Sequence, residues 1–143
     1  MSPSIQALAA SVLLSVSIGV AANPSPESIP GSTYVDGPDA RALFDQGVLF
    51  IDTRVDADYD AGRVPGAVNF TIYANDPERN QFTEENLLSV LEDKQEPFVL
   101  YCNSISCHRT AQATERAVAW GFENAYYYRH GFPDWRSHGY PFE

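Results

Sequence analysis

Residues 98–110 read FVLYCNSISCHRT, and this stretch carries more structural information than any other part of the chain. Its first four residues are apolar and have the length of a strand that is covered on both faces. A polar turn follows them, and a helical pattern then runs from Thr110 to Trp120 and ends before Gly121. Cys102 therefore stands between a buried strand and a loop that leads into the N-terminus of a helix.

This position of Cys102 favours a reactive thiolate. The N-terminus of a helix carries free N–H groups and the positive end of the helix dipole, which both stabilise S⁻ relative to SH. The thiolate is the nucleophilic form of cysteine. His108 and Arg109 add positive charge, and residues 98–113 contain no Asp or Glu in a chain that has 19 of them. We expect Cys102 to be a nucleophile; the alternative is a small buried hydrophobic residue at a strand end.

Strand and helix patterns alternate on both sides of this stretch. Short apolar runs predict strands over residues 33–35, 48–51, 68–70, 98–101 and 124–128. Helical periodicity and capping residues predict helices over residues 38–46, 55–61, 83–93, 110–120 and 132–138. This alternation predicts an α/β fold with a mainly parallel central sheet and helices on both faces. In such sheets the functional site lies beyond the carboxyl ends of the strands, where Cys102 is expected.

The N-terminus has a different composition. Residues 1–22 contain no charged side chain and, apart from Gln6, are apolar or small from Ile5 onward. They end in Val20-Ala21-Ala22, a sequence that signal peptidase accepts, so we predict a signal peptide that is cleaved after Ala22. The expected location is then periplasmic or secreted. The alternative is an uncleaved membrane anchor, for which a run of about 18 residues is barely long enough.

The rest of the chain is long enough for one domain. Residues 23–32 contain three prolines and three serines and predict a linker, and residues 33–143 contain the predicted strands and helices. The net charge of −10 argues against nucleic acid and against anionic membrane surfaces, so we expect neither as a stable partner. The two cysteines and three histidines have no spacing typical of a zinc site, and no metal or cofactor is expected.

The two cysteines, Cys102 and Cys107, would both lie in an oxidising compartment if the protein is exported. A disulfide between them would close a very short loop and add little stability, because the entropic gain grows with loop length. A redox-active or catalytic pair is therefore a better explanation than a structural crosslink. Three roles stay open for Cys107: a resolving or disulfide partner of Cys102, the primary sulfur carrier, or an inert loop thiol.

Two segments together resemble the rhodanese family. The first is IDTR at 51–54 with DYDAGRVPGAVN at 58–69, which is similar to the family's I-D-x-R … E-Y … G-H-I-P-G-A-I-N. The second joins VLYC at 99–102, the pair Arg109-Thr110, and three later pieces, and is similar to V-x-Y-C … R-S … L-G-F … G-G-F-x-x-W … G-x-P. The later pieces are WGF at 120–122, GFPDW at 131–135 and GYP at 139–141.

The resemblance covers residues 33–143 and implies a rhodanese-like domain with thiosulfate sulfurtransferase activity. Cys102 would take the outer sulfur of a small sulfur-containing anion such as thiosulfate, hold it as a persulfide, and pass it to a thiol or to cyanide. Another exported protein is an alternative acceptor. The loop would bind the substrate mainly through backbone N–H groups, with the arginine as the anion clamp. These expected substrate-binding residues are Asn103, Ser104, Ile105, Ser106, Cys107, His108 and Arg109.

The loop departs from the family's usual pattern. Arg109 stands seven residues after Cys102, so the loop is two residues longer than in the usual sulfurtransferase. Some rhodanese-like proteins are similar in carrying a second cysteine two residues before the arginine, as Cys107 does here. The alternatives to sulfur transfer are thiol–disulfide exchange by the cysteine pair and a non-catalytic carrier of sulfur or a soft metal ion. A phosphatase is disfavoured by the loop length.

Asp52 and Arg54 follow the predicted strand at 48–51. We expect them to form a structural ion pair that holds the end of this strand and the turn at 62–66. The resemblance places this arginine near the site, so a role facing the substrate is also open. Arg129 and His130 lie at the same end of the predicted sheet and are further candidates for the rim of the site.

Overall fold

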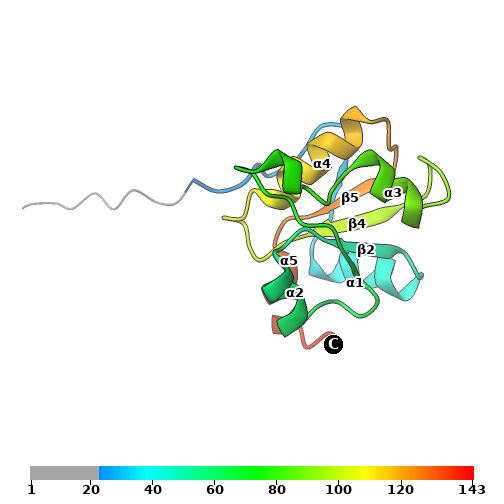
Figure 1. The fold of residues 1–143 in the computed structure, drawn as a ribbon. Helices are drawn as coiled ribbons and strands as arrows, with labels where there is room; N and C mark the ends of the chain where they lie inside the picture. Colours follow the sequence, from blue (N-terminus) through cyan, green and yellow to red (C-terminus); the bar gives the residue numbers. More distant parts are fainter. Residues whose placement is uncertain (1–22) are drawn as a thin grey trace, which may run out of the picture.

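Five short parallel strands form the centre of the structure, a computed structural model that describes residues 23–143 (Figure 1). Their order across the sheet is β1-β5-β4-β2-β3, and every neighbouring pair is parallel. The strands are β1 (Thr33–Tyr34), β2 (Leu49–Asp52), β3 (Val68–Asn69), β4 (Phe98–Tyr101) and β5 (Ala125–Tyr128). The predicted signal peptide lies outside the described residues.

Helices cover both faces of this sheet. Figure 1 shows α3 and α4 on one side and α1, α2 and α5 on the other. The helices are α1 (Gly37–Asp45), α2 (Asp56–Ala61), α3 (Glu84–Val90), α4 (Arg109–Ala119) and α5 (Gly131–Ser137), with a short 3-10 helix, η1 (Pro77–Arg79). Within residues 23–143, no helix is long and apolar enough to cross a membrane. The predicted α/β fold with a parallel sheet is confirmed.

The core explains why β4 is a continuous apolar run. All four of its residues are fully buried. Phe98 and Leu100 pack into the cluster under α3 and α4, whereas Val99 and Tyr101 pack into the cluster under α1 and α5. Successive side chains of a strand point to opposite faces, so a strand with two covered faces needs an apolar residue at every position.

The predicted elements agree with the structure except at some ends. Helix α3 stops at Val90, three residues before the predicted end at Asp93, because Leu91 adopts an extended conformation and packs into the core. Helices α4 and α5 each begin one residue earlier than predicted. Glycine follows α4 as expected, and Gly121 has a φ of +90°.

Residues 23–32 differ from the predicted linker. Ser25 is 2% exposed and Ile29 is 4% exposed, and Ile29 packs against Ala111 and Tyr127. The Tyr127 hydroxyl donates a hydrogen bond to the Pro26 carbonyl at 2.9 Å. Proline removes N–H donors but leaves carbonyls free to accept, so a proline-rich segment can still be bound along a domain surface. We call residues 23–29 the N-terminal strap.

Candidate active site

Cys102 lies directly after β4, at the carboxyl end of the parallel sheet. It is 1% exposed, and its carbonyl accepts a hydrogen bond from the Phe132 N–H at 2.9 Å. Gly131 precedes this contact with a φ of +72°, and a Cβ at that position would clash with the Cys102 carbonyl. A glycine is therefore required for α5 to begin so close to the cysteine backbone.

The loop after Cys102 is closed by a disulfide bond to Cys107. The two residues are five apart in sequence, and their Cα atoms are separated by 6.4 Å. Cys102 is buried, whereas Cys107 is only half-buried. The structure thus shows the oxidised form of the pair and identifies Cys107 as the disulfide partner of Cys102. We call residues 103–108 the active-site loop.

Side chains of the active-site loop divide into an anchored part and an exposed part. The Asn103 side chain donates to the Asp58 carboxylate at 2.9 Å and accepts from Arg54 at 3.4 Å. The hydroxyls of Ser104 and Ser106 lie 2.8 Å apart. The Cys107 N–H donates to the Ser104 carbonyl at 3.0 Å, while Ile105 is 39% exposed. Within this loop, Cys107 is bonded to Cys102 and Asn103 is anchored to Asp58 and Arg54, and substrate binding by the loop stays a prediction.

The N-terminal strap holds the tip of this loop. The Ser25 N–H and hydroxyl both donate to the Ile105 carbonyl, at 2.6 and 2.7 Å. The His108 ring lies 3.0 Å from the Asn23 carbonyl. Arg129, a candidate for the rim of the site, instead donates to the Ser25 carbonyl at 2.7 Å. Ser25 and Ile105 are 80 residues apart in sequence, yet these hydrogen bonds join the strap and the loop into one substructure.

Arg109 is the first residue of α4, and its Nε donates to the Ile72 carbonyl at 3.0 Å. In this oxidised form its side chain is thus directed at the segment after β3, and its role as an anion clamp stays a prediction. The next residue is firmly anchored. Thr110 is buried, its hydroxyl lies 3.1 Å from that of Thr53, and the Thr53 hydroxyl donates to the Tyr101 carbonyl at 3.0 Å.

The expected ion pair between Asp52 and Arg54 is present and buried. Their side chains are joined at 2.6 Å, and they are 0% and 3% exposed as residues. The Arg54 guanidinium also donates to the Gly62 carbonyl at 2.7 Å and lies 4.5 Å from the centre of the Phe132 ring. The pair thus connects the end of β2, the turn after α2 and the start of α5. Through Asn103 it also contacts the active-site loop.

The buried pair of Asp52 and Arg54, which we call the platform, affects the ionisation of Arg54 itself and of the neighbouring Tyr101. Burial lowers the pKa of Arg54, but hydrogen bonds to Asp52 and the negative charge of Asp52 raise it by more, so the guanidinium stays charged. Burial raises the pKa of Tyr101, and the charge of Asp52 raises it further. The neutral Tyr101 hydroxyl accepts a hydrogen bond from the Val64 N–H at 3.2 Å. Neither group changes charge between pH 5 and 8.

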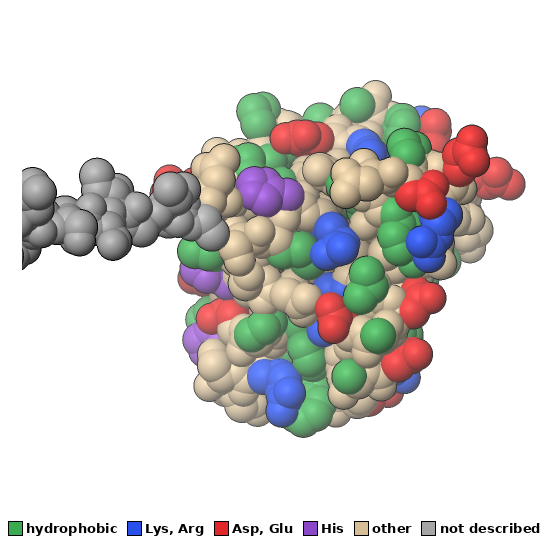
Figure 2. All heavy atoms as spheres, turned by 60° about the vertical axis from the view of Figure 1, so that its left-hand side comes forward, with side chains coloured by type: hydrophobic (Ala, Val, Ile, Leu, Met, Phe, Trp, Pro, Cys, Tyr) green, Lys and Arg blue, Asp and Glu red, His purple; other side chains and the backbone are tan. Residues whose placement is uncertain are grey.

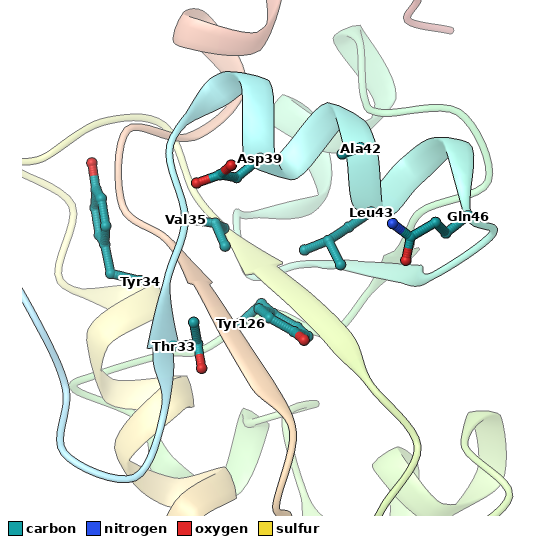
Figure 3. Close-up of a pocket in the computed structure, with 8 residues that line it drawn as sticks. All are labelled: Thr33, Tyr34, Val35, Asp39, Ala42, Leu43, Gln46 and Tyr126. Carbon is teal, nitrogen blue, oxygen red and sulfur yellow. The ribbon is translucent and has the colours of Figure 1, made fainter.

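Two surface hollows lie away from the cysteine pair. One of about 290 Å³ lies between β1 and α1, where Val35, Leu43 and Tyr126 contribute apolar lining (Figure 3). The other, of about 480 Å³, is lined by Glu27, Ser28, Tyr34 and Arg129. Neither is lined by the active-site loop. Figure 2 shows one face of the molecule, with acidic side chains gathered mainly toward its right-hand edge.

A family comparison agrees with this geometry. The sequence model of the rhodanese-like domain family matches residues 28–138 of the chain. The chain belongs to the rhodanese-like domain family. The match begins at Ser28, inside the N-terminal strap and ahead of β1. No curated protein matches the chain.

Solved structures share this rhodanese-like fold at low sequence identity. The Alr3790 protein from Anabaena sp. superposes with a TM-score of 0.61 and 22% identity over 76% of this chain and 90% of that one. A thiosulfate sulfurtransferase from Pseudomonas aeruginosa superposes with a TM-score of 0.62 and 17% identity, over 78% of this chain and 20% of that protein. RPA3614 from Rhodopseudomonas palustris is described as a possible tyrosine phosphatase. It superposes with a TM-score of 0.56 and 23% identity, over 82% of this chain and 98% of that one.

Sequence reasoning missed three residues of this rhodanese-like site. Asp58 stands in the DYDAGR segment that carries the family resemblance, and this position could have signalled its contact with Asn103. Gly131 stands in the GFPDW segment, but only its φ and its approach to Cys102 explain why glycine is needed. Ser25 lies in a proline-rich segment and has no local signal at all.

Proposed function

We propose that the protein is an exported thiosulfate sulfurtransferase in which the reduced Cys102 carries sulfur as a persulfide. The observation that carries this proposal is the place of Cys102, buried at the carboxyl end of β4 and followed by a loop that leads into α4. Membership of the rhodanese-like family supports the same chemistry. The donor would be a small sulfur-containing anion, and the acceptor a thiol or cyanide.

The reaction needs a thiolate and a cradle for negative charge. The Cys102 thiolate would attack the outer sulfur of thiosulfate, form a new S–S bond, and release sulfite as the old S–S bond breaks. The persulfide anion would be stabilised by backbone N–H groups of the active-site loop and by the positive end of the α4 dipole. Arg109 would add charge if its side chain leaves the Ile72 carbonyl in the reduced form.

Export is part of the same proposal. The uncharged segment at residues 1–22 supports a signal peptide, and a disulfide in the active-site loop fits an oxidising compartment. The net charge of −10 supports a small substrate rather than nucleic acid. An alternative acceptor to cyanide or a small thiol is another exported protein.

The observed disulfide also favours a second function, thiol–disulfide exchange with other exported proteins. This alternative predicts a defined reduction potential for the pair and no dependence on sulfur donors. A carrier of sulfur or of a soft metal ion such as Cu(I) predicts stoichiometric binding without turnover.

Intact mass spectrometry separates these functions. The reduced protein would be treated with thiosulfate in parallel with Cys102→Ser and Cys107→Ser. Sulfur transfer predicts that Cys107→Ser gains the mass of one sulfur atom, with release of sulfite, and that Cys102→Ser gains none. Sulfur loading of Cys102→Ser but not of Cys107→Ser would exclude Cys102 as the carrier. No sulfite from any form would favour thiol–disulfide exchange.

A further inference from the structure

The disulfide shows that the Cys107 sulfur reaches the one sulfur that would carry a persulfide. The pair is closed in the structure, and the Cys107 N–H is bonded within the same turn to the Ser104 carbonyl at 3.0 Å. Cys107 is also two residues before Arg109, where α4 begins, so the positive end of the helix dipole favours its thiolate. A thiolate this close to a persulfide can attack its inner sulfur and displace the outer one.

We propose that Cys107 discharges the Cys102 persulfide as hydrosulfide and thereby couples sulfur transfer to an external dithiol. This rests on the proposed function, because it needs sulfur on Cys102. The Cys107 thiolate attacks Sγ of Cys102, the Cys102–Cys107 bond forms, and the bond from Sγ to the outer sulfur breaks. The persulfide reacts in its protonated form, so the outer sulfur keeps that proton and leaves as hydrosulfide with the electron pair of the broken bond. The product on the protein is the disulfide seen in the structure.

The exposure of the two cysteines determines how the cycle restarts. Cys102 is 1% exposed, whereas Cys107 is half-buried, so an incoming thiolate reaches Cys107 first. Attack there forms a mixed disulfide on Cys107 and releases Cys102 as a thiolate, which is the form that accepts sulfur. The second thiol of the reductant then attacks the mixed disulfide, frees Cys107 and leaves as a disulfide. A dithiol is therefore the matching co-reactant.

The overall reaction balances without any other reagent. One thiosulfate and one dithiol give one sulfite, one hydrosulfide, one proton and one disulfide of the reductant. The outer sulfur gains two electrons, and the dithiol loses two. The cycle differs from transfer to cyanide or to a thiol because the acceptor never touches the outer sulfur.

The N-terminal strap supports this role for the loop. Ser25 donates two hydrogen bonds to the carbonyl of Ile105, which stands between the two cysteines. The strap itself is fixed by Arg129 through the Ser25 carbonyl. The tip of the loop is thereby held in the conformation in which the two sulfur atoms are bonded. The strap acts as a positioning element for the discharge step.

A single-turnover experiment tests the discharge. The full chain would be reduced, separated from the reductant without oxygen, and mixed with thiosulfate, and sulfite, hydrosulfide and intact mass would be followed together. The parent is expected to release one hydrosulfide for each sulfite and to end as the disulfide. Cys107→Ser is expected to release sulfite but no hydrosulfide, and to retain the added sulfur. With dithiothreitol added, the parent should turn over faster than Cys107→Ser, whose persulfide can only be taken up directly by the external thiol.

Matched samples separate the possible failures. Cys107→Ser combined with Ser106→Cys keeps two thiols but moves the second one, and it should release hydrosulfide more slowly than the parent. A parent that keeps its persulfide as long as Cys107→Ser would overturn this inference while leaving the proposed function intact. Absence of sulfite from every form would overturn the proposed function, and the discharge with it. Treating the oxidised parent with glutathione should place the adduct on Cys107; an adduct on Cys102 would contradict the restart step.

Discussion

The ends of β2 and β4 are neighbours in the sheet, yet the chain is fixed after them in opposite ways. After β2, the buried ion pair of Asp52 and Arg54 has all its charge compensated inside the protein. After β4, the active-site loop is half-exposed and is fixed by one disulfide and by the N-terminal strap. The first arrangement cannot change without a large energetic cost, whereas reduction of the disulfide would remove one of the restraints on the second. A rigid platform beside a loop with a reducible crosslink fits the proposed thiol chemistry.

Breaking the platform should have the largest effect. Asp52→Asn keeps the shape of the side chain but leaves the Arg54 charge buried without a counter-ion, and this should cost about 3–5 kcal/mol of unfolding free energy. The control is Asp45→Asn, which removes a partly exposed pair with Arg41 and should cost less than about 1 kcal/mol. Urea denaturation measures both. Equal losses of unfolding free energy in the two variants would show that the buried pair contributes no more stability than the surface pair.

The contact of α5 with Cys102 should be the next most sensitive feature. Gly131 and Gly139 share a φ of +72°, but only at Gly131 would a Cβ meet another part of the backbone, the Cys102 carbonyl. Gly139→Ala should cost about 1–2 kcal/mol for the left-handed conformation alone. Gly131→Ala should cost about 1–3 kcal/mol more, because backbone must move to relieve the clash. Thermal unfolding compares them, and equal melting temperatures would disprove the close approach.

Opening the disulfide should weaken the fold only modestly. Crosslinking two residues five apart removes little entropy from the unfolded chain, so reduction should cost about 2 kcal/mol or less. The measurement is urea denaturation with and without a reductant, with Cys107→Ser as a reference that should not respond. A loss as large as that of Asp52→Asn would mean that the disulfide is a structural crosslink and not a reversible one.

The strap should have the smallest effect on stability and a selective effect on the loop. Ser25→Ala and Ser32→Ala each remove a hydroxyl that donates to a backbone carbonyl at 2.7 Å, and each should cost about 1 kcal/mol. Only Ser25 bonds to the active-site loop, so only Ser25→Ala should speed reduction of the disulfide by a thiol. Stopped-flow reduction gives the rates. The same rate in both variants would refute a strap that positions the loop.

The sequence predicted what local patterns can encode. The apolar run of β4, with Phe98 and Leu100 toward one face and Val99 and Tyr101 toward the other, is a strong signal because burial on two faces needs it. The place of Cys102 at the end of that strand follows directly. Long-range contacts could not be predicted from local sequence patterns, since no residue near Ser25 indicates a partner at Ile105. The hydrogen bond from Arg109 to the Ile72 carbonyl could not be predicted for the same reason.

The distance along the chain between partners also sets an order of events when the protein first folds. Cys102 and Cys107 are five residues apart, and closing so short a loop takes far less than a microsecond in an unfolded chain. Ser25 and Ile105 are 80 residues apart, so their contact closes a far longer loop and is expected to form later. Oxidation of the cysteines therefore does not have to wait for the fold. With Cys102 and Cys107 the only cysteines, early oxidation within one chain has a single product, so it cannot trap the protein in a wrong topology.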